Sequence, residues 1–104
     1  MIAITISGIL AKDANVVRVK DRDYLSIVIN ASRAKEDAVW VNIMYWTRDL
    51  SQMQRYLLKG ARIVASGTRY TDKVYQGKEA PQIDRTLWAD ALDIVHFVEH
   101  DDLP

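Results

Sequence analysis

Hydrophobic and polar residues alternate along most of this chain. Residues 2–7 carry an isoleucine at every second position, which is the pattern of a β-strand with one buried face. The same alternation returns at residues 16–20 and 24–31. Residues 21–23, all charged, separate these two segments and predict a hairpin turn. The first third of the chain therefore predicts three strands.

The next predicted strand, over residues 38–46, carries the most informative pattern. It follows a short polar segment that predicts a second chain reversal. Alternation places valines, an isoleucine and a tyrosine on one face, and Trp40, Asn42, Met44 and Trp46 on the other. If the first face is the core face, two indole rings point outward, where hydrophobicity alone would not put them.

The hydrophobic period changes after Trp46. Asp49 and Gln52 can form a capping pair, apolar residues then recur every three or four positions, and Gly60 follows as a stop signal. This pattern predicts one helix of about ten residues.

Strand signals resume at residues 61–71, with Gly67 where a coiled strand would have to bend. Residues 72–85 contain a glycine and a proline and predict a long hairpin arm. Residues 86–98 predict a final strand, although several of their apolar residues would also fit one face of a helix.

A mostly β chain with a lone helix between its third and fourth long strands favours an all-β fold. The expected architecture is a five-stranded Greek-key OB-fold barrel whose helix plugs one end. Small sandwiches and SH3-like barrels are alternatives, but they do not usually have a helix at this place. We expect an OB-fold domain over residues 1–98 and a short acidic C-terminal tip over residues 99–104.

Composition is that of an ordinary globular domain. The chain has 104 residues, 49% of them hydrophobic, with 14 basic and 14 acidic side chains. Three of the acids lie in residues 99–104, which leaves 14 bases against 11 acids elsewhere. A surplus this small does not by itself indicate a nucleic-acid partner. The sequence contains no pattern of a signal peptide or membrane span, so we expect a cytoplasmic protein without a membrane partner.

Groups for catalysis are scarce. The chain has no cysteine, which excludes disulfides, thiolate zinc sites and thiol nucleophiles. Its only histidines are His96 and His100, close to the C-terminal end. Neither a P-loop nor a nucleophile elbow is present. We therefore expect no enzymatic activity, no metal site and no cofactor.

Aromatic and basic residues are interleaved in the second half of the chain. Outward-facing aromatic rings flanked by cations are what a groove for single-stranded nucleic acid requires, because bases stack on the rings and cations neutralise phosphates. The tryptophans would alternatively pack under the arm or in a subunit contact, and Trp88 fits the core equally well. The candidate residues for binding nucleic acid are Trp40, Trp46, Arg48, Arg69, Tyr70, Lys73, Tyr75 and Trp88.

Three segments together resemble the bacterial single-stranded DNA-binding protein family. Residues 4–13 resemble its first strand, with an apolar run, a glycine and a turn ending in aspartate. Residues 40–46 resemble its Trp-led strand, which has a second aromatic residue six positions on. Residues 56–67 resemble the end of its helix and the strand that follows, with Tyr-Leu, Lys-Gly and a final glycine in register.

The resemblance implies specific roles. Trp40 and Trp46 fall on two base-stacking positions of the family, and Arg48 and Lys73 on basic positions beside them. A third stacking position aligns with Val74, so we assign that role to the neighbouring Tyr75.

The chain also departs from the family pattern. A further family tryptophan has no counterpart in residues 33–38, and Val41 stands where many members have a histidine at a subunit contact. The family's Gly/Gln/Pro-rich tail has no counterpart, while residues 100–104 resemble a shortened form of its acidic tip without the final phenylalanine.

The expected function is sequence-tolerant binding and protection of single-stranded DNA in replication, recombination or repair. By resemblance the protein is expected to form a homotetramer or homodimer, and its acidic tip is a candidate docking site for replication or repair proteins. One alternative is a primosomal, replication-restart adaptor that acts mainly through protein partners. Another is a structural module whose tryptophan face is a subunit interface.

Overall fold

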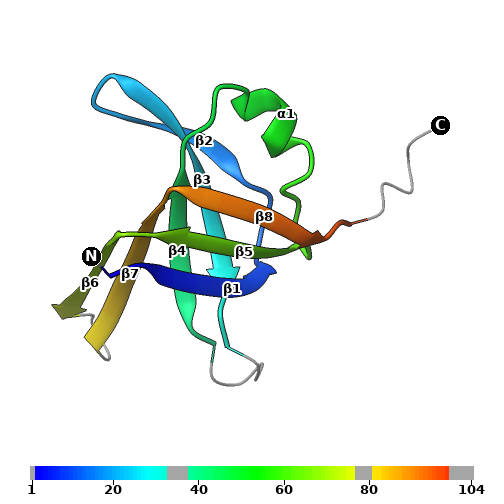
Figure 1. Ribbon diagram of the computed structural model, residues 1–104. Helices are drawn as coiled ribbons and strands as arrows, with labels where there is room; N and C mark the ends of the chain where they lie inside the picture. The colour runs from blue at the N-terminus through cyan, green and yellow to red at the C-terminus, as the bar shows by residue number, and fades with distance from the viewer. Residues whose placement is uncertain (1, 33–37, 77–80, 99–104) are drawn as a thin grey trace.

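The computed structural model describes residues 2–32, 38–76 and 81–98 (Figure 1). The predicted acidic tip, most of the polar reversal before Trp40 and the end of the predicted arm lie outside the described residues. In chain order the elements are β1 (Ile4–Leu10), β2 (Asn15–Val19), β3 (Arg22–Asn30), β4 (Trp40–Tyr45), α1 (Leu50–Gln54), β5 (Arg62–Gly67), β6 (Arg69–Gln76), β7 (Pro81–Ala89) and β8 (Ala91–His96).

The strands close into a barrel through one parallel contact. β1 pairs antiparallel with both β3 and β5, β3 pairs with β4, and β5 pairs with β8. β4 then pairs in parallel with β7. Since only Asp90 separates β7 from β8, these two segments form one bent strand that joins β4 to β5 and completes the ring.

Two other long strands are also bent. Thr68 separates β5 from β6, which together form one bent strand. Residues 11–14 separate β1 from β2 in the same way, and within this bend Ala11 still donates its backbone N–H to the carbonyl of Val28 on β3. When each bent pair is counted once, the barrel has five strands, with α1 between the third and the fourth. The predicted five-stranded OB fold is confirmed.

The helix is shorter than predicted. Asp49 caps it, its side chain accepting a hydrogen bond from the backbone N–H of Gln52 at 3.1 Å, but the helix ends after five residues. The N–H groups of Tyr56 and Leu57 still donate to carbonyls three residues earlier, but the chain then turns to the end of β1 and the bend after it: Lys59 N–H donates to Asp13 Oδ1 and Gly60 N–H to the Leu10 carbonyl. The predicted length was wrong because this tertiary contact replaces the later turns of the helix.

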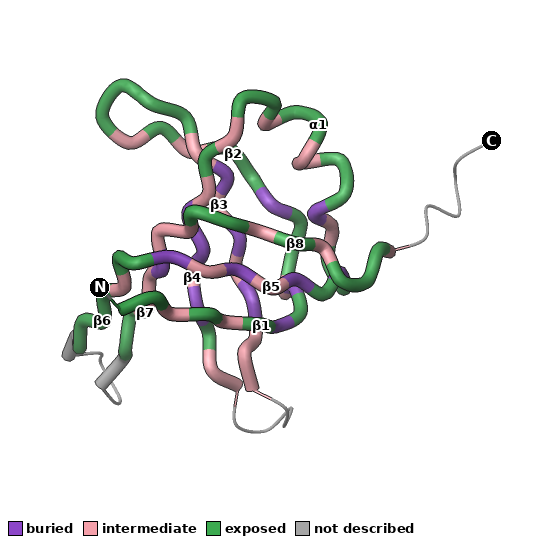
Figure 2. Tube along the Cα trace, in the orientation of Figure 1, coloured by how far each residue is buried: buried purple, intermediate pink, exposed green. Residues whose placement is uncertain are grey.

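Inward-facing residues of the bent strands fill the barrel, as the buried stretches along β3, β4 and β5 show (Figure 2). The predicted core face of residues 38–46 is confirmed, because Val41 and Ile43 are buried. Met44, predicted on the outer face, is only 6% exposed, since it lies between its register partners Ser26 and Trp88. The fully buried large side chains are Leu10, Leu25, Ile27, Ile29, Ile43, Leu57, Ile63 and Leu87.

No described helix is long and apolar enough to cross a membrane.

Candidate nucleic-acid interface

Strand register brings distant aromatic and basic residues to one side of the barrel. Met44 on β4 pairs with Trp88 on β7, and Trp88 pairs with Arg69 on β6. Side chains of residues that pair across a sheet share one face. These three residues therefore form a row on the sheet face opposite the core, which we call the outer face.

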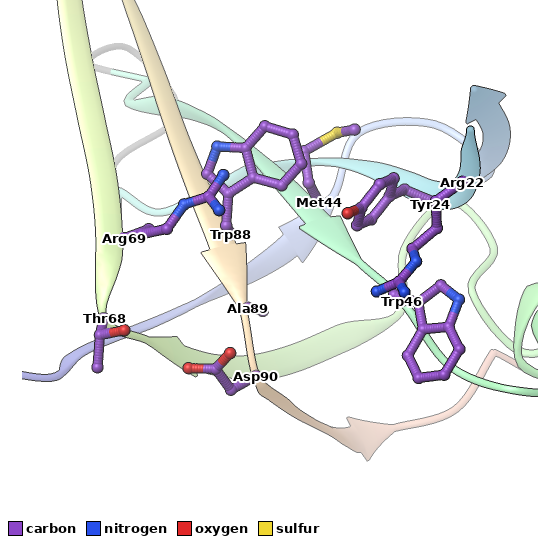
Figure 3. Close-up of a pocket in the computed structure, with 9 residues that line it drawn as sticks. All are labelled: Arg22, Tyr24, Met44, Trp46, Thr68, Arg69, Trp88, Ala89 and Asp90. Atoms are coloured by element: carbon purple, nitrogen blue, oxygen red, sulfur yellow. The ribbon is translucent and has the colours of Figure 1, made fainter. Parts of the chain in front are cut away.

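The outer face is hollowed where the strands β3, β4 and β7 end or begin. A pocket of about 250 Å³ opens there (Figure 3). A second hollow, of about 490 Å³, adjoins it and shares Arg22, Tyr24, Arg69 and Trp88 as lining residues. We call the two together the aromatic groove. The first pocket is lined by Arg22, Tyr24, Met44, Trp46, Thr68, Arg69, Trp88, Ala89 and Asp90.

Each of the two indoles in the groove has an arginine against its ring. The guanidinium carbon of Arg22 lies 4.8 Å from the centroid of Trp46, and that of Arg69 lies 4.6 Å from the centroid of Trp88. Both distances lie within the range of cation–π attraction. The groove therefore carries its positive charge directly beside its stacking surfaces.

Tyr24 holds the Trp88 ring in place. Their centroids are 5.3 Å apart and their planes meet at 84°, an edge-to-face arrangement. Trp88 is half-buried between Tyr24 and Arg69, whereas Trp46 remains 44% exposed. The groove thus has one indole that is held by its neighbours and only partly exposed, and one that is more widely exposed.

The two arginines are available to an anion. Within the described part of the chain, the ion pair recorded is Arg18 with Asp23, and neither Arg22 nor Arg69 has a carboxylate within ion-pair distance. Cations that are not already neutralised by a carboxylate are the groups that phosphate binding uses.

The structure brings three of the predicted residues together in the groove: Trp46, Arg69 and Trp88. Trp40 is 49% exposed, as predicted, and its backbone pairs with Asn30, at the other end of β4 from Trp46. Lys73 is exposed on β6. It lies on the same side of the strand as Arg69 and Thr71, two residues beyond Thr71.

The remaining three predicted residues lie elsewhere or are not described. Arg48 is exposed in the segment between β4 and α1. Tyr70 pairs with buried Leu87 and packs against the core, so its side chain lies on the opposite side of β6 from Arg69. Tyr75 belongs to β6 and pairs with Gln82, but its side chain lies outside the described part of the structure.

Sequence reasoning missed Arg22 and Tyr24. It assigned residues 21–23 to a turn, but β3 already begins at Arg22 and the two-residue turn is Lys20-Asp21, with Lys20 at φ 57°. The predicted turn began one residue too late and ended two residues too late, because Lys20 adopts the left-handed conformation, which most residues other than glycine and asparagine avoid. The alternation of Arg22 with Tyr24 was the signal that could have indicated a shared face.

No group of three or more His, Asp or Glu side chains suited to a metal ion occurs among the described residues. The polar side chains among the lining residues of the groove are instead the guanidinium groups of Arg22 and Arg69, the hydroxyls of Tyr24 and Thr68, the Lys20 ammonium, and the carboxylates of Asp21 and Asp90. Such a set can bind anions and the edges of nucleobases.

Comparison with known proteins shows the fold. No family model matches the chain, and no curated protein sequence matches it. Among solved structures, the mitochondrial single-stranded DNA-binding protein Rim1 of S. cerevisiae aligns with a TM-score of 0.63 and 14% identity, over 92% of this chain and 96% of that one. A Plasmodium falciparum SSB in complex with single-stranded DNA aligns with a TM-score of 0.57 and 14% identity, over 93% and 94%. The resemblance in fold that the sequence indicated is confirmed.

Proposed function

We propose that this protein binds single-stranded DNA through the outer face of its barrel. The observation that carries the proposal is the aromatic groove, in which two indoles meet two arginines that have no carboxylate partner among the described residues. Exposed rings beside cations serve unpaired bases and their phosphates together. The likeness in fold to a protein solved with single-stranded DNA supports the same ligand.

In this proposal Trp46 and Trp88 each offer a ring face to a base. Arginine covers one face of each indole, so a base stacks on the other face or replaces the guanidinium, which then turns to a phosphate. Trp40 lies about 20 Å from Trp46, at roughly 3.3 Å per residue of strand. It therefore provides a second stacking point further along the DNA, with Lys73 and Arg48 as additional phosphate partners.

The cellular role follows from such binding. A protein that coats single strands without a catalytic step would protect them during replication, recombination or repair. One barrel offers a short groove, so an assembly of two or four copies would bind a longer stretch of DNA. A primosomal adaptor with the same fold would bind DNA weakly and protein partners strongly.

A binding titration tests the proposal. The full chain is added to a fluorescently labelled dT oligomer at low salt, and anisotropy and tryptophan emission are recorded together. We expect saturable binding, quenched tryptophan emission, weak competition by duplex DNA, and an affinity that falls as salt rises. Absence of both binding and quenching would refute the proposed function.

A further inference from the structure

We propose that Asp90 gives the aromatic groove a preference for bases that carry an exocyclic amino group. This inference rests on the proposed function and adds to it a reading of base identity at one nucleotide position. Stacking alone tolerates every base, so a preference needs a polar group that meets the edge of the base.

The backbone fixes Asp90 at the end of the groove. It forms the bend between β7 and β8, where its backbone N–H donates to the carbonyl of Ser66 at 2.8 Å. Gly67, at the end of β5, lies against this bent strand. A Cβ added at Gly67 would collide with the Trp88 carbonyl oxygen, so β5 and β7 come this close only because glycine has no side chain. Thr68 follows Gly67 directly and Asp90 lies two residues after Trp88, so this contact also fixes the distance between Thr68 and Asp90.

Their side chains share one end of the pocket. The Thr68 hydroxyl and the Asp90 carboxylate point toward one another there, below the Trp88 ring (Figure 3). Trp88 and Asp90 are two residues apart on the same bent strand. A base stacked on Trp88 would thus have its edge near the carboxylate.

The carboxylate of Asp90 is exposed and can meet a ligand in the groove. The carboxylate lines the same pocket as Arg22 and Arg69 but is not within ion-pair distance of either, among the residues that the structure describes. A carboxylate repels phosphate and accepts hydrogen bonds only. The partner that suits it best is an exocyclic amino group, which cytosine, adenine and guanine carry. Thymine has a single ring N–H, at position 3, and it lies between two carbonyl oxygens that a carboxylate repels.

The test compares octanucleotides of deoxycytidine and deoxyuridine, two pyrimidines that lack the methyl group of thymine and differ in the groups at ring positions 3 and 4. Wild-type protein should bind the cytidine octamer roughly fivefold to tenfold more tightly, as one hydrogen bond to an exposed carboxylate provides. Asp90→Asn should bring the ratio of affinities close to one, because an amide both donates and accepts. Circular dichroism checks that the variant is folded.

Asp93→Asn is the matched control. Asp93 is exposed on β8, does not line the groove, and loses the same unit of charge. Asp93→Asn should keep the wild-type ratio of cytidine-octamer to uridine-octamer affinity. Its affinity for both octamers should rise as much as that of Asp90→Asn does from the loss of one negative charge. A wild-type ratio below about twofold, or a ratio that Asp90→Asn leaves unchanged, overturns the inference. Equal binding of both octamers refutes only the base preference, whereas no binding of either refutes the proposed function as well.

Discussion

Arg69 and Trp88 face each other across β6 and β7 as a register pair, with the guanidinium carbon 4.6 Å from the ring centroid. The pair joins a cation to an aromatic ring in a single cross-strand contact. Arg22 and Trp46 repeat the same relationship at the other wall of the groove. The proposed binding of DNA therefore uses positive charge and ring surface at the same two points of the groove.

Replacing Arg69 with alanine should weaken binding to a dT oligomer by about 1 kcal/mol, roughly fivefold, at low salt. The slope of log affinity against log salt should fall by about one, because one phosphate contact is lost. The measurement is a titration at several salt concentrations. Arg62→Ala is the matched control, since Arg62 is an exposed arginine on β5 that does not line the groove. An equal loss in both variants would mean that only net charge matters.

Replacing Trp46 with alanine should weaken binding by about 1–3 kcal/mol, the usual contribution of one stacked base. Because Trp46 is 44% exposed, its loss should change the melting temperature little. Phe97→Ala serves as the control: Phe97 is 53% exposed and packs against Tyr56, with their ring centroids 5.6 Å apart, rather than in the groove. Unchanged DNA affinity in Trp46→Ala would exclude this ring as a stacking surface.

Trp40→Ala separates DNA binding from assembly. We expect weaker DNA binding, again by about 1–3 kcal/mol, and an unchanged molar mass by size exclusion with light scattering. If Trp40 instead forms a subunit interface, the variant will show a lower mass. That outcome would favour the structural-module alternative.

Gly67→Ala should destabilise the fold, because the added Cβ meets the Trp88 carbonyl oxygen and the Ala89 backbone. Backbone atoms cannot rotate away as a flexible side chain would. Overpacking against backbone costs about 1–3 kcal/mol. In a domain of this size each kcal/mol lowers the melting temperature by roughly 4–8 °C. Ser66→Ala, at the preceding and only partly buried position, should melt close to wild type. Equal melting temperatures for Gly67→Ala and wild type would contradict the close approach of β5 and β7.

Lys20→Gly should stabilise the free protein by about 0.5–1 kcal/mol, since it relieves a left-handed lysine at φ 57° at some cost in backbone entropy. Thermal melting without DNA measures the effect. Lys12→Gly is the comparison, because Lys12 is exposed and has no positive φ, so glycine there should lower the melting temperature. A loss of stability in Lys20→Gly would show that the hairpin turn does not hold this strain.

The sequence predicted what depends on local periodicity. Alternation along residues 38–46 placed Val41 and Ile43 in the core and left Trp40 and Trp46 exposed. The parallel pairing of β4 with β7 joins residues more than forty positions apart, and no local pattern carries that information. For this reason the sequence allowed two placements of the Trp88 side chain, in the core or in the groove. The register of Trp88 with Met44 and Arg69 decides for the groove.

The errors have the same origin. The helix stopped early because residues 59–60 bond to the bend after β1, a tertiary contact. Tyr70 was grouped with Arg69 because they are neighbours in sequence, but adjacent residues of a strand face opposite ways. Arg22 was missed because the hairpin turn lies one residue earlier than its charges suggested.

The central claim is that nucleobases stack on the indoles of the outer face. The direct measurement is a two-dimensional NMR spectrum of the three indole N–H groups, assigned with Trp→Phe variants, during addition of a dT octamer at low salt. If bases stack there, the Trp46 and Trp88 signals will shift together and saturate with one binding constant, and the Trp40 signal will move with them. Indole signals that stay in place while the octamer is present in excess would contradict it.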